Sequence, residues 1–377
     1  MNGIIAEVAR RGRMTCSEYM ELALYDPELG YYTRTRRGAG PAGGGGDFLT
    51  APSASPVLAR TLAGLLRRLA ETTGEALCLA ELGAGEGLLL AELLATLGET
   101  RGSTLSRVVA VERGEWARQR LAERCPGVET VAELAEVSRP GDPAVLFASE
   151  LYDALPVHRV VMSRDGDRLE LHELLVEAHA GALRWVEGPP SDPAITAYLE
   201  SHGISLCEAQ RAEVRLLTAP LHTRHLEWCG LQGLALIVDY GHPAGRLYDP
   251  RLRRDGTLVG YQGHRVVWDV LREPGDCDIT AHVNFDDLAA CALECGWENA
   301  PMRPLGLFLA MAGAAEHLPP AVARGDPLTP REWAELAAFK RVLAPSGMGS
   351  DLKVLAQGRG RVWSAYQALA TMPPSEA

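Results

Sequence analysis

Residues 79–87 place three glycines, each separated by one residue, directly after an apolar run that ends in an acid. A helical pattern of leucines follows at once, so the segment predicts a strand, a tight turn and a helix. Glycine suits a backbone that takes a positive φ or approaches a ligand closely. The first N–H groups of the helix can bind a carboxylate or phosphate. A dinucleotide fingerprint would need a third glycine at position 88, which is Leu88. We therefore expect a nucleotide-type site, with a plain glycine-rich turn as the alternative.

A second acid supports this interpretation. Residues 107–112 have the pattern of a short buried strand that ends in Glu112. The separation between Glu81 and Glu112 fits one strand–helix–strand unit. A carboxylate at the end of the second strand can accept both ribose hydroxyls of a nucleoside. The alternative is a surface acid at a strand end.

Composition narrows the class of protein. A chain of 377 residues with a formal net charge of −12 disfavours broad nucleic-acid binding, which needs a cationic surface, and suits a cationic or protein substrate. The eight cysteines form no C-x-x-C pair and no Cys/His cluster, so we expect no metal site and a reducing compartment. No apolar run approaches the ~20 residues of a membrane span, and the N-terminus lacks a secretory apolar core. By elimination, the sequence predicts a cytoplasmic protein.

The order of the patterns predicts an α/β fold. Strands and helices alternate through the first half of the core, which implies a parallel sheet with helices on both faces. Alternating residues and turn signals predict hairpins over residues 158–187, and a helical stretch follows over about 192–229. The expected strands are 78–82, 107–112, 128–131, 144–148, 234–239 and 352–356, and the expected helices include 57–69, 86–97, 114–124 and 286–295.

Four regions follow from these patterns. An N-terminal arm contains a predicted capping box in which Thr15 caps a helix and Glu18 reciprocates. The regions are residues 1–60, the arm and lid; 61–157, the first part of the nucleotide-binding core; 158–230, an inserted substrate-side hairpin and helical region; and 231–377, the second part of the core, with a helical insert near 302–345.

Several segments together resemble the MidA-like S-adenosylmethionine (SAM)-dependent methyltransferases, a family that includes a mitochondrial complex I assembly protein-arginine methyltransferase. The resemblance covers about residues 15–360 and includes the run G-D-F-L-T-A-P and the E-x-G-x-G-x-G turn. It implies a class I, Rossmann-like, seven-strand-type methyltransferase core, SAM as cofactor and S-adenosyl-L-homocysteine as product. The implied reaction is methylation of an arginine nitrogen of a protein. The segments are Tyr19, 27–32, 46–52, 81–87, 149–158, 237–242, 278–285, 348–349 and 352–354.

The candidate cofactor-binding residues come from the glycine turn, the two strand-end acids and the segments that the resemblance adds. Aromatic side chains of the arm could close an apolar lid over SAM, although such residues are as often plain core. The candidates are Tyr32, Phe48, Thr50, Pro52, Glu81, Gly83, Ala84, Gly85, Gly87, Glu112, Arg113 and Ser149.

Glu150 and Asp153 are the candidate catalytic residues, and Asp47 could line the same pocket. They follow the fourth strand, where the methyl group is expected, and an i, i+3 spacing puts them on one face if the segment is helical. A guanidinium has a pKa above 12 and is a poor nucleophile, so carboxylates must orient it and accept its proton. The alternative is that Glu150 and Asp153 cap a helix start. Single histidines after strands, among them His282, are interpreted as hydrogen-bonded structural groups rather than bases.

Two departures from the family pattern keep other functions open. Ser53 stands where the family has Glu, and Ser149 stands where it has Asn. Methylation of a small-molecule or carrier-bound intermediate is one alternative, and a non-catalytic SAM-binding assembly factor is another. The expected partner is a protein or small-molecule methyl acceptor, with neither nucleic acid nor a membrane, and a homodimer is possible.

Overall fold

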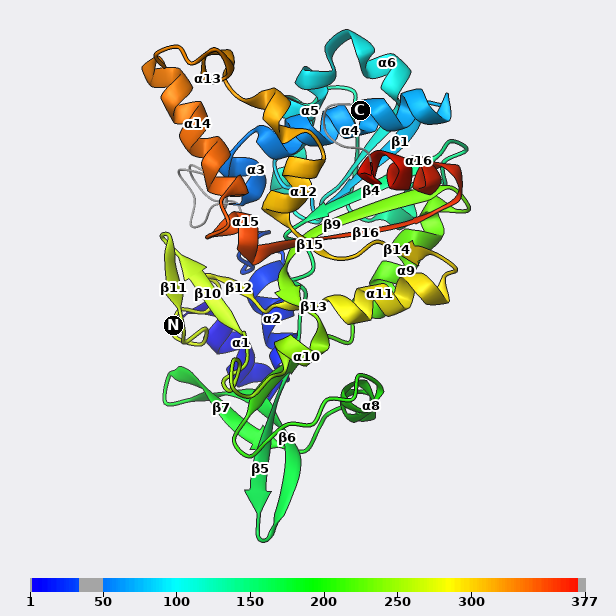
Figure 1. The fold of residues 1–377 in the computed structure, drawn as a ribbon. Coiled ribbons are helices and arrows are strands. Elements are labelled where there is room, and N and C mark those ends of the chain that lie inside the picture. The colour runs from blue at the N-terminus through cyan, green and yellow to red at the C-terminus, as the bar shows by residue number, and fades with distance from the viewer. Residues whose placement is uncertain (1, 34–49, 372–377) are drawn as a thin grey trace.

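A mixed β-sheet runs through the middle of the molecule, and the computed structural model describes residues 2–33 and 50–371 (Figure 1). Seven strands lie in the order β14-β16-β9-β4-β1-β2-β3. Strands β9, β4, β1, β2 and β3 pair in parallel, and β16 pairs antiparallel with β9. The strands are β1 (Leu77–Leu82), β2 (Leu105–Val111), β3 (Glu129–Val131), β4 (Ala144–Ser149), β9 (Gly233–His242), β14 (Glu298–Asn299) and β16 (Leu352–Arg359).

The strand order reverses beside β1. The chain moves outward from β1 through β2 to β3, and then returns to place β4 on the other side of β1. In open α/β sheets such a reversal opens a crevice at the carboxyl ends of the strands, where ligands bind. The predicted glycine turn and Glu112 therefore lie at one edge of the sheet. The α/β class I core is confirmed, and each of the six expected strands forms within a few residues of its expected bounds.

Helices cover both faces of the sheet (Figure 1). One apolar core joins α4, α5, α7, α12 and α16 to side chains from one face of the strands, and a second joins α9 and α11 to the other face. The alternation of side chains along a buried strand feeds both cores, because neighbouring residues point to opposite faces. The helices are α4 (Val57–Thr73), α5 (Leu88–Leu97), α7 (Glu115–Arg124), α9 (Thr218–Cys229), α11 (Phe285–Glu294), α12 (Leu305–Met311) and α16 (Gly360–Thr371).

The N-terminal arm packs away from the central sheet. Its helices α1 (Gly3–Arg11) and α2 (Cys16–Tyr25) share a third core with Val176 and Ile279 of two smaller sheets. The capping box of α2 is confirmed: Thr15 Oγ1 accepts from Glu18 N–H at 3.1 Å, and Glu18 Oε2 accepts from Thr15 N–H at 2.7 Å. Short α3 (Ala51–Ala54) precedes α4.

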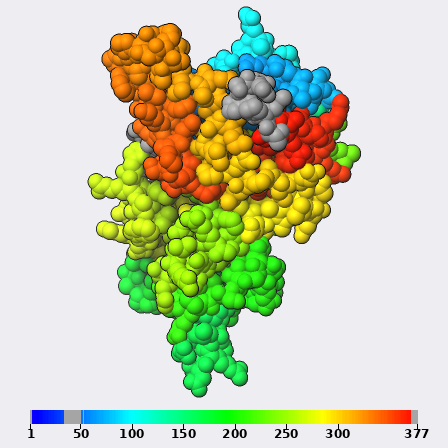
Figure 2. All heavy atoms as spheres, in the orientation of Figure 1, coloured from blue at the N-terminus to red at the C-terminus, as the bar shows by residue number. Residues whose placement is uncertain are grey.

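The inserted region is a four-stranded antiparallel sheet in the order β7-β6-β5-β8, and it projects from one end of the molecule (Figures 1 and 2). Its hairpins follow the prediction, with β5 (His158–Asp165), β6 (Arg168–His179) and β7 (Ala182–Gly188). The expected continuous helical stretch over 192–229 is wrong. It divides into α8 (Pro193–Ser201), β8 (Arg211–Val214) and α9, because β8 pairs with the free edge of β5, a partner that local periodicity does not reveal.

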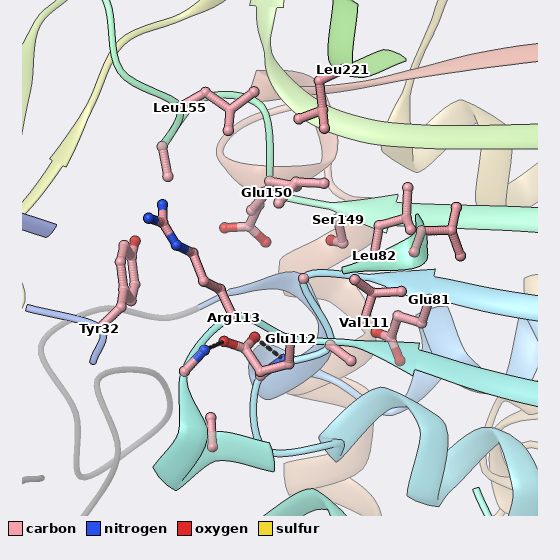
Figure 3. Close-up of a pocket in the computed structure, with 18 of the residues that line it drawn as sticks. Tyr32, Glu81, Leu82, Val111, Glu112, Arg113, Ser149, Glu150, Leu155 and Leu221 are labelled. Atoms are coloured by element: carbon pink, nitrogen blue, oxygen red, sulfur yellow. Dashed lines mark hydrogen bonds between the residues drawn. The ribbon is translucent and has the colours of Figure 1, made fainter. Parts of the chain in front are cut away.

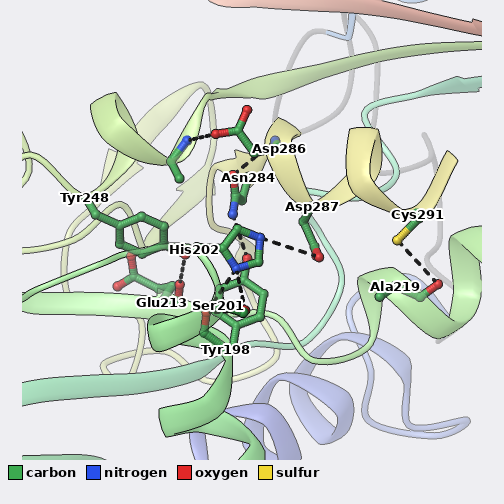
Figure 4. Close-up of polar contacts among 11 residues, drawn as sticks. Tyr198, Ser201, His202, Glu213, Ala219, Tyr248, Asn284, Asp286, Asp287 and Cys291 are labelled. Atoms are coloured by element: carbon green, nitrogen blue, oxygen red, sulfur yellow. Dashed lines mark hydrogen bonds and ion pairs between the residues drawn. The ribbon is translucent and has the colours of Figure 1, made fainter. Parts of the chain in front are cut away.

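Polar contacts join the inserted region to the core (Figure 4). Asn284 Nδ2 donates to the Tyr198 hydroxyl at 2.9 Å, and Tyr248 donates its hydroxyl proton to the Glu213 carbonyl at 2.9 Å. His202 of the loop after α8 lies 3.9 Å from Asp287 of α11. The region is thus held against the carboxyl edge of the central sheet.

The remaining elements are short, apart from the 14-residue helix α14 (Pro330–Leu343). A three-stranded sheet, in the order β11-β10-β12, was not expected from the sequence. The expected helical insert near 302–345 is confirmed. Within the described ranges, no helix is both long and apolar enough to cross a bilayer. The elements are η1 (Gly98–Thr100), α6 (Arg101–Thr104), η2 (Leu134–Glu136), α10 (Ala244–Leu247), β10 (Val259–Gln262), β11 (Arg265–Val267), β12 (Asp278–Thr280), β13 (Val283–Asn284), β15 (Arg303–Pro304), η3 (Ala314–His317), α13 (Pro320–Arg324), α14 (Pro330–Leu343) and α15 (Met348–Asp351).

Replacing Phe147 with alanine tests the sheet core. The side chain lies in central strand β4 with 1% of its surface exposed. A Phe147→Ala change should lower the free energy of unfolding by about 3–5 kcal/mol, because it leaves a cavity. Leu293→Ala on α11, where Leu293 is 65% exposed, is the control and should change it by less than about 0.5 kcal/mol. Urea unfolding followed by circular dichroism measures both, and similar effects would contradict the described core.

Candidate active site

A cavity of about 1140 Å³ opens at the carboxyl edge of the central sheet. The glycine turn after β1, the end of β2 and the turn after β4 form one side of it (Figure 3). Tyr25 and Tyr32 of the arm, Tyr240 of β9 and α9 contribute other walls. The topology predicted a crevice at this place, and the cavity is large enough for a nucleoside with an amino-acid tail.

The glycine turn is bound to β2 by its own backbone. Gly83 N–H and Ala84 N–H both donate to the Val111 carbonyl, at 2.8 and 3.1 Å. Gly83, Gly85 and Gly87 have φ of 70°, 53° and 75°, a region that side chains disfavour. A Cβ on Gly83 would lie 3.0 Å from Leu151, whereas a Cβ on Gly85 would meet no protein atom within 4 Å. Gly85, which lines the cavity, therefore leaves room for a ligand.

The two strand-end acids, Glu81 of β1 and Glu112 after β2, both lie next to this turn. The Glu112 carboxylate accepts from Gly85 N–H at 2.9 Å and from Gly114 N–H at 2.7 Å (Figure 3). Glu81 is only 4% exposed, and its Oε2 has no hydrogen-bond partner among the described residues. Burial raises the pKa of both carboxyls, although the backbone N–H groups partly offset the rise in the pKa of Glu112.

A buried polar atom without a partner costs about 1–3 kcal/mol, so such atoms point to a missing ligand. Three of them belong to residues that line this cavity: Glu81 Oε2, the Ser149 hydroxyl and His282 Nδ1. A ligand with an ammonium group and hydroxyls supplies the donors and acceptors that they lack. The residues present therefore fit SAM, which carries an amino-acid tail, a sulfonium and a ribose.

Tyr32 and Arg113 lie at the side of the cavity formed by the arm (Figure 3). The Tyr32 hydroxyl donates to Asp278 Oδ1 at 2.5 Å, and its ring stacks on Tyr25 with 5.6 Å between centroids. The Arg113 guanidinium forms an ion pair with Glu21 and lies 4.8 Å from the Tyr25 ring centroid. Arg113 therefore links the end of β2 to the arm.

The described part of the segment before α4 begins at Thr50. Asp47 and Phe48 lie outside the described residues, as does the side chain of Pro52. Thr50 lines the cavity and caps α3, and Ser53 completes a capping box with it: Ser53 Oγ accepts from Thr50 N–H at 2.9 Å. Ser53, which replaces the family's Glu, thus has a local structural role outside the cavity lining.

Glu150 lies in the turn directly after β4, and no helix begins there. The segment is not helical, so the condition for an i, i+3 face is not met, and the helix-cap alternative is wrong. Glu150 instead has φ of 54°, which is uncommon for a residue with a side chain and often marks a functional site. Its N–H donates to the Val238 carbonyl at 2.8 Å, and its Oε1 accepts from Ala51 N–H at 2.8 Å. Tertiary contacts, rather than helix geometry, direct this carboxylate into the cavity.

Glu150 and Asp153 belong to a larger acidic cluster with Asp239 and Asp278. Burial raises the pKa of Glu150 to about 8 and that of Asp239 to about 7. Burial and the neighbouring acids raise the pKa of Asp153 well above its usual value. The positive charge of Arg215 offsets part of the negative charge of the cluster. Its guanidinium does not bond the carboxylates directly, because it donates to backbone carbonyls, those of Asp153, Leu155, Ala281 and His282.

The sequence interpretation did not assign Asp239 and Asp278 to the site. Asp239 accepts from the N–H groups of Leu151, Tyr152 and Tyr240, at 3.2, 2.8 and 2.8 Å, and so holds the turn that carries Glu150. Asp278 lines the cavity. The sequence did contain a signal for Asp239 and Asp278, because both lie in segments that carry the family resemblance. His282 lines the cavity too, and burial lowers its pKa to about 3.

Comparison with known proteins gives the family. Residues 57–302 match the model of a family of S-adenosyl-L-methionine-dependent methyltransferases, Methyltransf_28. The chain belongs to this family. The match spans the glycine turn, both strand-end acids and the whole acidic cluster. This methyltransferase uses SAM and releases S-adenosyl-homocysteine, so the expected enzyme class and cofactor are confirmed, and a non-catalytic assembly factor is not supported.

Curated and solved relatives agree with the family. The methyltransferase is 27% identical over 330 residues to the Danio rerio protein arginine methyltransferase NDUFAF7, mitochondrial, which covers 77% of this chain and 71% of the relative. The Drosophila melanogaster homologue is 25% identical over 94% of this chain and 84% of its own length. A solved Burkholderia thailandensis protein with bound S-adenosyl-homocysteine is 27% identical, with a TM-score of 0.78 over 94% of this chain and 92% of that one.

The expected cytoplasmic location is contradicted by the curated relatives, which are named as mitochondrial proteins. The expectation rested on elimination. Unpaired cysteines indicate a reducing environment, but they do not distinguish one reducing compartment from another.

A Gly85→Val change tests the turn. The new side chain enters space that no protein atom occupies at the lining of the cavity, and the φ of 53° is also unfavourable to it. We expect S-adenosyl-homocysteine affinity to fall about 100-fold or more, because the backbone can no longer approach the ligand. Gly74→Val, at φ of 70° in the cap of α4, is the matched control with the same backbone penalty far from the cavity lining. Calorimetry measures both, and equal losses of affinity would show that Gly85 has no special role.

Proposed function

We propose that the methyl acceptor of this enzyme is a guanidinium nitrogen of an arginine in a protein substrate. The observation that carries the proposal is the acidic cluster, because Glu150, Asp153 and Asp278 line the same cavity as the glycine turn. Asp239 lies directly behind them and holds the turn. Grouped carboxylates with raised pKa values favour a cation that restores their charge. The names of the curated relatives support the same acceptor.

The cofactor, when bound, supplies a methyl group already activated by a positive sulfur. The protein then has to align the acceptor nitrogen with that methyl group. Orientation alone can lower the activation free energy by ~7–11 kcal/mol. Glu150 is positioned for this role, since it follows β4 and points into the cavity beside Ser149 (Figure 3). Its carboxylate would hold the guanidinium and accept the proton that the nitrogen loses.

The other groups support Glu150. Asp153 adds negative charge next to it, and Tyr32 with Asp278 forms a wall against which a planar cation can lie. Asp47 remains a proposed contributor, and it lies outside the described residues. The candidate SAM-binding residues around the glycine turn remain proposals too, as do the four regions. In this scheme the arm covers the cavity and the projecting inserted region docks the protein substrate.

Ser53 was the reason to consider a small-molecule acceptor. The capping box with Thr50 accounts for Ser53, whose own side chain does not line the cavity. No observation in the cavity therefore favours a metabolite over an arginine side chain. A homodimer and the absence of nucleic-acid binding remain predictions, which size-exclusion chromatography and a filter-binding assay can test.

Glu150→Gln tests the proposed role. The change keeps the size of the side chain but removes the negative charge and the ability to accept a proton. We expect kcat for methylation of an arginine-containing protein substrate to fall about 10²–10⁴-fold. S-adenosyl-homocysteine affinity should stay close to that of the unchanged enzyme. Retained transfer would exclude Glu150 as the proton acceptor, and loss of cofactor affinity would assign it to cofactor binding instead.

The raised pKa values predict a pH dependence. Near pH 7 the Glu150 carboxyl, with its pKa of about 8, is mostly protonated in the empty enzyme. A bound guanidinium lowers that pKa, so binding should release protons near pH 7 and almost none above pH 9. The kcat/KM should rise with pH through about 8 and then level off.

Calorimetry in two buffers with different ionisation heats measures the released protons. Burial is the main cause of the raised pKa of Glu150, and the charges of Asp239 and Asp278 add to it; Asp153 and Arg215 belong to the same charged cluster. Glu150→Gln is the control and should release fewer protons. Equal release by both proteins would assign the titration to another member of the cluster.

A further inference from the structure

A buried chain of four polar side chains leads from the sheet to the cavity. Gln357 of β16 contacts His222 of α9, with 2.7 Å between Oε1 and Nε2. His222 Nδ1 lies 2.8 Å from the hydroxyl of Tyr152, which belongs to the turn after β4. The same hydroxyl lies 3.2 Å from Nδ1 of His225, one helical turn further along α9. The mechanism of methyl transfer uses none of these side chains.

The direction of this chain follows from Gln357. Its amide nitrogen donates to the Leu288 carbonyl at 2.9 Å and to Asn299 Oδ1 at 2.8 Å, so its oxygen is the acceptor for His222. His222 must therefore carry its proton on Nε2. Burial lowers the pKa of His222 to about 4, so near pH 7 this ring is neutral and its Nδ1 has only a lone pair. Tyr152 donates its one proton to that lone pair.

The tautomer of His225 is then determined as well. The Tyr152 oxygen has given away its proton, so it can only accept from His225, whose proton must lie on Nδ1. Burial lowers the pKa of His225 to about 3, so this ring is neutral and its Nε2 carries an unshared lone pair. No hydrogen bond reaches Nε2 from the part of the chain that the structure describes.

His225 lies at the apolar end of the cavity, with 8% of its surface exposed. Leu221 and Trp228 of α9 and Leu134 of η2 form the wall around it. The Trp228 indole is fixed by donation to the Val137 carbonyl at 3.1 Å. This wall covers the sheet face that carries Leu82 and Val111, whereas Glu81 belongs to the opposite side of β1. Leu221, Trp228 and Leu134 give this slot apolar walls, with an acceptor nitrogen among them. The charged side chains of Arg139, Arg224 and Glu227 also line the cavity.

We propose that His225 Nε2 accepts a hydrogen bond from the exocyclic amine of the cofactor's adenine, and that Tyr152, His222 and Gln357 act as positioning residues that hold this tautomer. An adenine has an apolar, planar body and one edge that donates N–H, which is what this slot fits. A base with a carbonyl at the same place would direct its lone pairs at the lone pair of Nε2. The proposal concerns the cofactor and does not depend on which acceptor is methylated.

The test compares two product analogues by calorimetry. S-adenosyl-homocysteine has the amine, and S-inosyl-homocysteine has a carbonyl in its place. The unchanged enzyme should bind the adenine compound about tenfold more tightly or better, as expected for one hydrogen bond exchanged for a lone-pair conflict. In His225→Leu this ratio should fall to about one, while the melting temperature shows that the protein is folded.

Tyr152→Phe provides the second variant. It leaves His225 in place but removes the group that orders its tautomer, so the ratio should fall to an intermediate value. This readout separates positioning from a purely structural role, because general loosening would weaken both analogues equally and leave the ratio unchanged. Glu133, an exposed acid that also lines the cavity, is the competing acceptor.

Glu133→Gln should therefore keep the ratio of the unchanged enzyme. Three outcomes would overturn the proposal: no discrimination by the unchanged enzyme, full discrimination by His225→Leu, or loss of discrimination in Glu133→Gln alone. Because the readout is cofactor affinity, it is unaffected if the arginine acceptor proves wrong.

Discussion

The carboxylate of Asp239 organises the active site of this protein. It is fully buried, and its oxygens accept from three backbone N–H groups: those of Leu151 and Tyr152, in the turn after β4, and its own neighbour Tyr240. A buried charge is expensive unless it is well paired, so this pairing is a strong constraint on the turn. Both halves of the site depend on it. Glu150, which has a positive φ, lies in this turn and lines the cavity. Tyr152, in the same turn, contacts His225 through its hydroxyl.

The cavity has two electrostatic ends. At one end lie Glu150 and Asp153, whose pKa values are raised by burial and by neighbouring acids. Their charged forms are unfavourable there unless a cation binds. At the other end, the apolar side chains of Leu221, Trp228 and Leu134 line the cavity together with His225, which is neutral because burial lowers its pKa to about 3. A ligand that is planar and uncharged at one end and positive at the other matches this gradient. The glycine turn and Glu112 lie along the same cavity and set the distance of approach.

The arm and the inserted region build the site from outside the sheet. Tyr25 and Tyr32 reach the cavity from the arm, and Arg113 at the end of β2 is paired with Glu21 of α2. Arg215, directly after β8 of the inserted region, satisfies the carbonyls around Asp153. A core sheet alone would leave this edge open to water. The additions exclude water from the acids, and that exclusion is what raises their pKa values.

Local sequence patterns determined the α/β core, the glycine turn, the two strand-end acids and the capping box of α2. These features depend on periodicity, on φ values that favour glycine and on hydrogen bonds between near neighbours, all of which are visible in a short window. Tertiary structure decided the rest. It paired β8 with β5, placed Glu150 in a strained turn instead of a helix, and brought Asp239, Asp278 and His225 to the cavity. The physical reason is that these outcomes depend on contacts between residues far apart in the chain, whose free energies no local pattern contains.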